Sequence, residues 1–142
     1  MQKESVLKIL VICTGNSARS QMAEGLLRHL ASDRFEVFSA GVKPTDVNPL
    51  SVKVMKEIGI DISKQRSKSI DDLSDQSFDY IVTLCDSARQ SCPVFPGNSI
   101  SIHWDIEDPA QAKGTEEEKI NVFRKIRGQI KDHILGFLNK DK

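Results

Sequence analysis

The sequence lacks the features typical of membrane, secreted or nucleic-acid-coating proteins. No apolar run approaches the roughly 20 residues that span a bilayer, and the apolar stretch after Met1–Ser5 is too short for a secretion signal. The 20 basic and 20 acidic side chains cancel to a formal charge of zero, whereas binding along a phosphate backbone needs a basic surplus. We therefore expect a cytoplasmic protein that binds neither membrane nor nucleic acid.

Cysteine is scarce and odd in number. The three cysteines, Cys13, Cys85 and Cys92, are widely spaced. A secreted disulfide scaffold uses more of them, in even number, and cytoplasmic cysteines stay reduced. These thiols are therefore either buried filler or reactive groups. A zinc site from Cys85, Cys92 and His103 lacks a Cys-x2-Cys pair, so we expect no metal.

What is present is an ordinary globular pattern of strands and helices. No repeat, low-complexity tract or linker interrupts the chain, which we interpret as one domain over residues 1–142. Short β-branched runs predict strands near residues 6–12, 35–39, 78–84 and 98–104. Helical patterns separate them, and the last begins with a capping box of Thr115 and Glu118. This alternation predicts an α/β fold with a parallel sheet covered on both faces.

Two cysteines fall where such a sheet binds ligands. Cys13 and Cys85 each come directly after a predicted strand, and ligands of open α/β sheets lie beyond the carboxyl ends of the strands. This placement favours a reactive role for Cys13 and Cys85 over a purely structural one.

The segment after the first strand is suited to an oxyanion. It has neither the Gly-x-Gly-x-x-Gly pattern of dinucleotide loops nor the Gly-Lys-Ser/Thr of nucleotide loops. Its backbone N–H groups and the following helix N-terminus make a concave anion site, and the guanidinium of Arg19 can hold two anion oxygens. The same field favours a nucleophilic Cys13 thiolate, to which Ser20 can donate a hydrogen bond. The predicted oxyanion-binding residues are Thr14, Gly15, Asn16, Ser17, Ala18, Arg19 and Ser20.

A cysteine and an arginine six residues apart are not specific alone, since chance produces that spacing in roughly one such chain in seven. A buried structural Cys13 remains an alternative at this point. The longer run Cys-Thr-Gly-Asn-Ser-Ala-Arg-Ser-Gln-Met-Ala-Glu-Gly at residues 13–25, however, resembles the low-molecular-weight tyrosine phosphatase superfamily. More narrowly, it resembles the thioredoxin-coupled arsenate reductases, and the likeness continues through residues 39–41, 56–63, 82–85, 92–93, 103–104, 108–110 and 114–118.

The resemblance implies a three-layer fold with a four-stranded parallel sheet in the order 2-1-3-4. It also implies that Cys13 attacks arsenate, that Cys85 then attacks Cys13 and that Cys92 attacks Cys85. Arsenite leaves, and thioredoxin reduces the final disulfide. No tightly bound cofactor is implied, phosphate and sulfate are expected competitors, and we expect a monomer.

The main alternative is a tyrosine phosphatase, which needs one thiolate, one arginine and one general acid. The resemblance assigns the acid to Asp108. Phosphatases of this family carry a tyrosine after the Asp-Pro pair, whereas this chain has Ala110-Gln111 and its single tyrosine, Tyr80, in a predicted strand. A third possibility is a non-catalytic anion-binding regulator, whose Cys13 would alkylate no faster than a free thiol.

The spacing of Cys85 and Cys92 has a consequence of its own. If residues 86–91 are helical, the two Cα atoms lie about 10 Å apart, whereas a disulfide needs them within roughly 7 Å. The segment must then partly unwind when the two cysteines join.

The resemblance also concerns the support of the loop. It implies that Asn16 holds the loop, assisted by Glu24 and Ser39. Some relatives bind potassium nearby through an acidic residue, but the chain reads Arg66-Ser67-Lys68 there. We expect the Lys68 ammonium in place of the ion, and a potassium site is the less favoured alternative.

Overall fold

The computed structural model describes residues 6–140; Met1–Ser5, over which the sequence predicts no secretion signal, lie outside this range. Four parallel strands form the sheet, in the order β2-β1-β3-β4. Their bounds are β1 Leu7–Cys13, β2 Phe35–Gly41, β3 Tyr80–Thr83 and β4 Ile100–His103. The predicted fold class and strand order are therefore confirmed.

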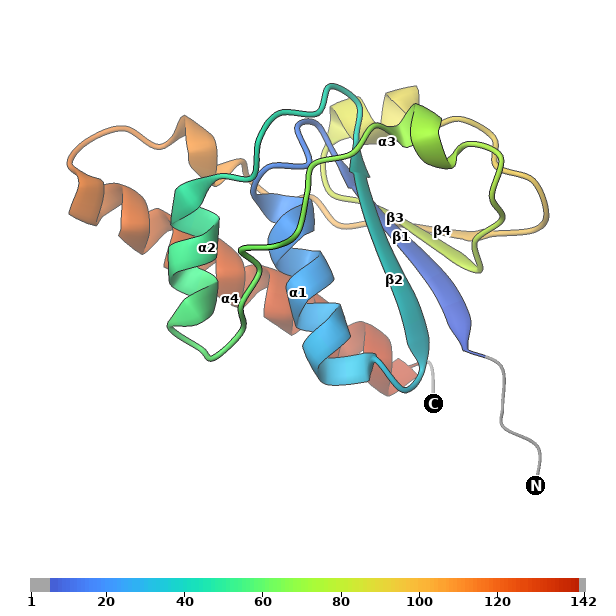
Figure 1. The fold of residues 1–142 in the computed structure, drawn as a ribbon, viewed down its shortest axis with the longest axis horizontal. Coiled ribbons are helices and arrows are strands. Elements are labelled where there is room, and N and C mark those ends of the chain that lie inside the picture. Colours follow the sequence, from blue (N-terminus) through green and yellow to red (C-terminus); the bar gives the residue numbers. More distant parts are fainter. Residues whose placement is uncertain (1–5, 141–142) are drawn as a thin grey trace.

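Helices cover both faces of this sheet (Figure 1). The α-helices are α1 Arg19–Ala31, α2 Pro49–Lys56, α3 Asp86–Ser91 and α4 Glu116–Lys140, and two short 3₁₀ helices are η1 Ile70–Leu73 and η2 Pro109–Gln111. None of the helices in the described part is long and apolar enough to cross a bilayer.

Strand β1 is the centre of the core because its side chains alternate between two apolar clusters. Ile9 and Val11 pack with α1, α2 and α4 on one face. Leu10 and Ile12 pack with η1 and α3 on the other face. This two-sided burial accounts for the continuous apolar run in the sequence.

The long helix α4 confirms the predicted capping box. Thr115 Oγ1 accepts a hydrogen bond from the Glu118 amide at 3.1 Å, and Glu118 Oε1 accepts one from the Thr115 amide at the same distance. The residues that α4 buries recur at the helical period and are all apolar: Ile120, Phe123, Ile126, Ile130, Ile134 and Leu138.

The carboxyl ends of β1 and β3 are neighbours because the two strands pair in parallel register, with Ile12 opposite Thr83. Cys13 ends β1, and Cys85 follows β3 by two residues. The fold therefore brings Cys13 and Cys85 to the same edge of the sheet.

Candidate active site

The loop between β1 and α1 is held in shape by Asn16. Its backbone has φ of 48°, in the left-handed region that asparagine tolerates better than most residues, and its side chain is fully buried. Asn16 Oδ1 accepts a hydrogen bond from the Lys68 amide at 2.8 Å, while Nδ2 donates to Ser20 Oγ at 2.7 Å and Ser39 Oγ at 2.9 Å. Asn16 thus ties the loop to β2 and to the segment before η1.

These bonds orient a proton toward the Cys13 sulfur. Ser20 Oγ accepts from Asn16 and lies 2.9 Å from Cys13 Sγ. A hydroxyl has a single proton, and with its oxygen accepting from Asn16 we assign that proton to the sulfur. A donated hydrogen bond stabilises a thiolate more than a thiol, which suits a nucleophile.

A carboxylate lies at the far end of this chain of hydrogen bonds. Ser39 Oγ donates to Glu24 Oε1 at 2.5 Å, and Glu24 also accepts from Arg28 Nε at 2.9 Å. Lys68 Nζ lies 3.8 Å from Glu24 Oε1, and burial lowers the pKa of Lys68. Because two cationic groups already face Glu24, a potassium ion there would meet charge repulsion, and these residues do not fit it.

Arg19 is anchored at the start of α1. The guanidinium donates to the Ile106 carbonyl oxygen at 3.0 Å and lies 3.7 Å from Asp108 Oδ2. Its side chain is only 7% exposed, whereas that of Asp108 is 31% exposed. The fold therefore places the predicted arginine, at the start of α1, beside the predicted general acid, which lies on the segment that leads into η2.

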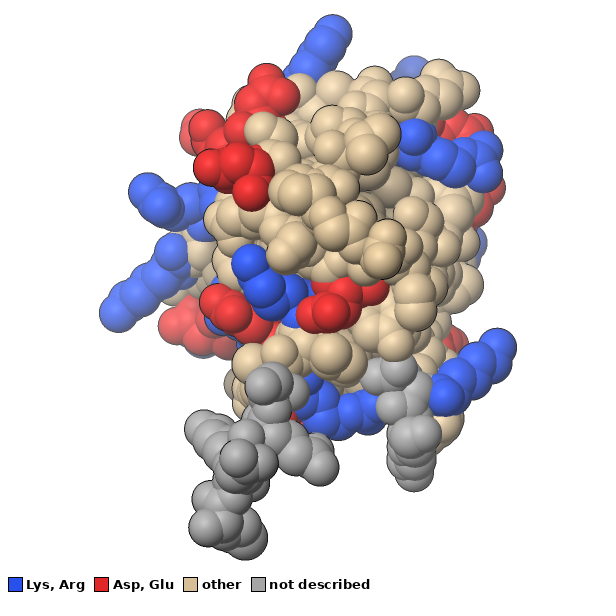
Figure 2. Space-filling model, turned by 90° about the vertical axis from the view of Figure 1, so that its right-hand side faces the viewer, with Lys and Arg blue, Asp and Glu red and all other residues tan. Residues whose placement is uncertain are grey.

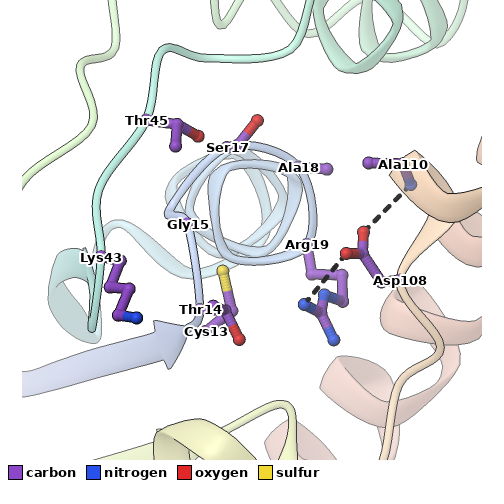
Figure 3. A pocket seen from close by; sticks show the side chains of 10 residues that line it. All are labelled: Cys13, Thr14, Gly15, Ser17, Ala18, Arg19, Lys43, Thr45, Asp108 and Ala110. Carbon is purple, nitrogen blue, oxygen red and sulfur yellow. Dashed lines mark hydrogen bonds and ion pairs between the residues drawn. The ribbon is translucent and has the colours of Figure 1, made fainter.

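A cavity of about 290 Å³ opens above this loop. Figure 3 shows Cys13 between Lys43 on one side and Arg19 with Asp108 on the other. The lining residues are Cys13, Thr14, Gly15, Ser17, Ala18, Arg19, Lys43, Thr45, Asp108 and Ala110. The side chains of Asn16 and Ser20, also predicted to bind the oxyanion, are fully buried and support the loop instead of lining the cavity.

The second cysteine touches the same loop. Cys85 Sγ and Thr14 Oγ1 form a hydrogen bond of 3.2 Å. Cys85 also caps α3, since its sulfur accepts a hydrogen bond from the Ala88 amide at 3.4 Å. The thiol of Cys85 is thus next to the residue that follows Cys13.

The third cysteine lies at the other end of α3. Cys92 follows the last helical residue, Ser91, and is half-buried. Burial raises the pKa of its thiol above the ordinary value. All three cysteines are free thiols here, so the helical form of residues 86–91 accompanies the reduced state.

Sequence reasoning missed some of these positions. Lys43 and Thr45 line the cavity from the β2–α2 connection, a loop without periodicity or motif.

His103 lies outside the cavity lining, and its Nδ1 is 2.7 Å from Thr83 Oγ1. Trp104 belongs to the buried core and stacks on the ring of the exposed His133. Within residues 6–140, no cluster of three or more His, Cys, Asp or Glu side chains is arranged to hold a metal ion.

Comparison with known proteins identifies the family. A family model described as low molecular weight phosphotyrosine protein phosphatase matches residues 8–141. The chain belongs to this family. A relative from Halalkalibacterium halodurans that is named arsenate reductase is 49% identical over 134 residues, which are 94% of this chain and 96% of the relative.

Solved structures agree with this placement. One described as an arsenate reductase in oxidized state superposes with a TM-score of 0.82 at 31% identity, over 96% of this chain and 100% of the other. A thioredoxin-dependent arsenate reductase from Corynebacterium glutamicum superposes with a TM-score of 0.67 at 26% identity, over 98% of this chain and 65% of that chain. The resemblance to arsenate reductases of the phosphatase superfamily is therefore confirmed.

Proposed function

We propose that the protein reduces arsenate to arsenite with three cysteines and is regenerated by thioredoxin in the cytoplasm. The observation that carries the proposal is the 3.2 Å hydrogen bond between Cys85 Sγ and Thr14 Oγ1, beside the anion cavity. Phosphate-ester hydrolysis uses one thiolate, but reduction of arsenate needs two electrons, which Cys13 and a second thiol beside the anion loop supply together by forming a disulfide. The arsenate-reductase relatives support the same assignment.

The first step forms a sulfur–arsenic bond. The Cys13 thiolate attacks arsenic, and the departing oxygen leaves as water after it takes protons, one of them from Asp108. Arg19 holds the remaining oxygens, and the N–H groups of the loop stabilise their charge. Asp108 lines the same cavity as Cys13 and Arg19, so its carboxyl group can reach an oxygen of the bound anion, as a general acid must.

The second step transfers the electrons. The Cys85 thiolate attacks Cys13 Sγ, the pair of electrons of the sulfur–arsenic bond stays on arsenic, and arsenite leaves. The Cys13–Cys85 disulfide holds the two oxidised sulfurs. Cys92 then attacks Cys85, which releases the Cys13 thiolate and leaves a Cys85–Cys92 disulfide for thioredoxin to reduce.

The surface beside Cys92 suits a protein reductant. Cys92 lines a groove together with Pro93, Val94 and Phe95, and Val94 is 97% exposed. Figure 2 shows an uncharged area in the upper centre of the face over the α3–β4 side of the molecule, with acidic and basic side chains around and below it. An uncharged, partly apolar surface next to an accessible disulfide is what a thioredoxin-like partner needs.

A tyrosine phosphatase is the weaker alternative. The cavity wall after Asp108-Pro109 is Ala110, which offers no ring for an aryl group. Tyr80 packs against Phe35 and Phe137 instead.

The deciding experiment is steady-state arsenate turnover with thioredoxin, thioredoxin reductase and NADPH, on the wild type and on Cys85→Ser. We expect turnover in the wild type and none in Cys85→Ser, with any aryl-phosphate hydrolysis retained by the variant. Turnover that survives Cys85→Ser would contradict the relay. Aryl-phosphate hydrolysis without arsenate turnover in the wild type would support the phosphatase alternative.

A further inference from the structure

The connection between β2 and α2 lies along the anion loop and is bonded to it repeatedly. The amide of Val42 donates to the Cys13 carbonyl at 3.2 Å, that of Lys43 to Thr14 at 2.8 Å and that of Thr45 to Gly15 at 2.9 Å. These bonds fix the backbone of Lys43 against the loop. Its side chain therefore starts from a defined place at the wall of the cavity.

The charges around the cavity are unevenly compensated. Arg19 faces Asp108 at 3.7 Å and also donates to the Ile106 carbonyl. Lys43 lines the same cavity, but within residues 6–140 it forms neither an ion pair nor a side-chain hydrogen bond. Arg19 thus has an acidic partner, whereas Lys43 is a lining cation without one among residues 6–140.

The position of Lys43 complements that of Arg19. Figure 3 shows the two side chains on opposite sides of Cys13, with Lys43 on the β2–α2 connection. An ammonium on a flexible stem can follow an oxyanion oxygen that the buried, anchored guanidinium does not reach. The chain as a whole has a formal charge of zero, so attraction of an anion depends on such local groups.

We propose that Lys43 is a second substrate-binding cation, which attracts a doubly charged tetrahedral oxyanion and binds it on the side opposite Arg19. This inference rests on the proposed function, since it concerns the same cavity and substrate class. A charge-assisted hydrogen bond of this kind contributes about tenfold to affinity. Because the Lys43 side chain is exposed to solvent, this contribution to affinity falls as the salt concentration rises.

The test uses inorganic phosphate as a probe, in a measurement that needs no redox turnover. Phosphate protects the reduced Cys13 from alkylation, and the concentration dependence of the protection yields a dissociation constant. We expect Lys43→Gln to weaken phosphate binding about tenfold at low ionic strength, with a smaller difference at high salt. Lys43→Arg restores binding to within about twofold, since it keeps the charge.

Lys53→Gln is the matched control. It removes the same charge from an exposed lysine of α2, outside the cavity lining. We expect it to bind phosphate like the wild type. An unchanged dissociation constant in Lys43→Gln would overturn the proposal, as would an equal loss in Lys53→Gln, because the effect would then come from overall charge.

Turnover supplies a second readout and separates the two proposals. In arsenate reduction, Lys43→Gln should raise KM about tenfold and leave kcat within about twofold, since uniform binding affects KM alone. If the wild type reduces no arsenate but Lys43→Gln still loses phosphate affinity, the proposed function fails and the role of Lys43 stands. If turnover occurs and Lys43→Gln binds phosphate normally, the role of Lys43 fails alone.

Discussion

The anion loop and the α3 segment follow neighbouring strands, yet they are built in opposite ways. Residues 13–20 hold a fully buried Asn16 and Ser20, joined by side-chain hydrogen bonds to β2 and to residues 67–68. Helix α3 has six residues, of which Ala88 alone is buried. A loop so fully bonded is preorganised for an anion, whereas a short exposed helix opens at low cost.

The largest effect should come from disturbing the anion loop. A Cβ on Gly41 would lie 2.7 Å from both the Asn16 nitrogen and the Thr14 oxygen, which are backbone atoms with no room to move. Gly41→Ala should therefore deform the loop at a cost of about 2 kcal/mol. If the full 2 kcal/mol raises the free energy of the loop conformation that binds the anion, phosphate affinity drops about thirtyfold.

Phosphate binding and urea unfolding of Gly41→Ala measure the two parts of this effect. Gly128→Ala is the control, since nothing lies within 4 Å of its added Cβ in α4. The control should gain roughly 0.5–1 kcal/mol of stability, because glycine weakens a helix interior. Equal phosphate affinity in Gly41→Ala and the wild type would show that the loop tolerates displacement.

The α3 segment should respond instead to pH, through Cys92. Burial raises the pKa of this thiol, so at neutral pH it is mainly protonated, and only the thiolate attacks a disulfide. Raising the pH increases the thiolate fraction, and the step from the Cys13–Cys85 to the Cys85–Cys92 disulfide should accelerate about tenfold per pH unit from pH 7 to 8.

Rapid quenching with an alkylating agent, followed by mass spectrometry, resolves this step. Cys92→Ser stops the reaction at the Cys13–Cys85 disulfide and gives the pH dependence of the earlier steps alone. A transfer rate that is flat between pH 7 and 8 would contradict a protonated Cys92.

Oxidation should increase the difference in local stability between the anion loop and α3. Helical residues 86–91 hold the Cα atoms of Cys85 and Cys92 about 10 Å apart, beyond the roughly 7 Å of a disulfide. In the Cys85–Cys92 disulfide form, we expect the amides of α3 to exchange hydrogen a few-fold faster than in the reduced form. Peptides that cover α4 are the internal reference and should not change. Unchanged exchange in α3 would rule out unwinding.

The sequence predicts more of the scaffold than of the cavity wall. The runs in β1 and α4 are readable because burial on two faces or on one helical face leaves a period in the residues. The Cys13 and Arg19 pattern is readable because anion chemistry restricts residue types. Lys43 has no such mark, since the bonds that place it beside Thr14 are between backbone groups.

The same limit applies to the partner of Arg19. Its hydrogen bond goes to the Ile106 carbonyl, and a carbonyl is available at every residue, so no side chain in the sequence indicates it. Asn16, by contrast, is indicated by resemblance, but its φ of 48° follows only from the closed loop. Features that depend on backbone contacts between distant segments therefore leave no pattern in the sequence.

The smallest predicted effect comes from changing the helix stability of α3 while all three cysteines are kept. Gln90 is exposed in α3, and Gln90→Gly should destabilise the helix by about 0.5 kcal/mol through propensity alone. If unwinding precedes formation of the Cys85–Cys92 disulfide, that step speeds up about twofold. Gln90→Ala favours the helix and should slow the same step, while neither variant alters phosphate binding at the anion loop. Single-turnover rates that respond to neither variant would mean that α3 opens without limiting the transfer.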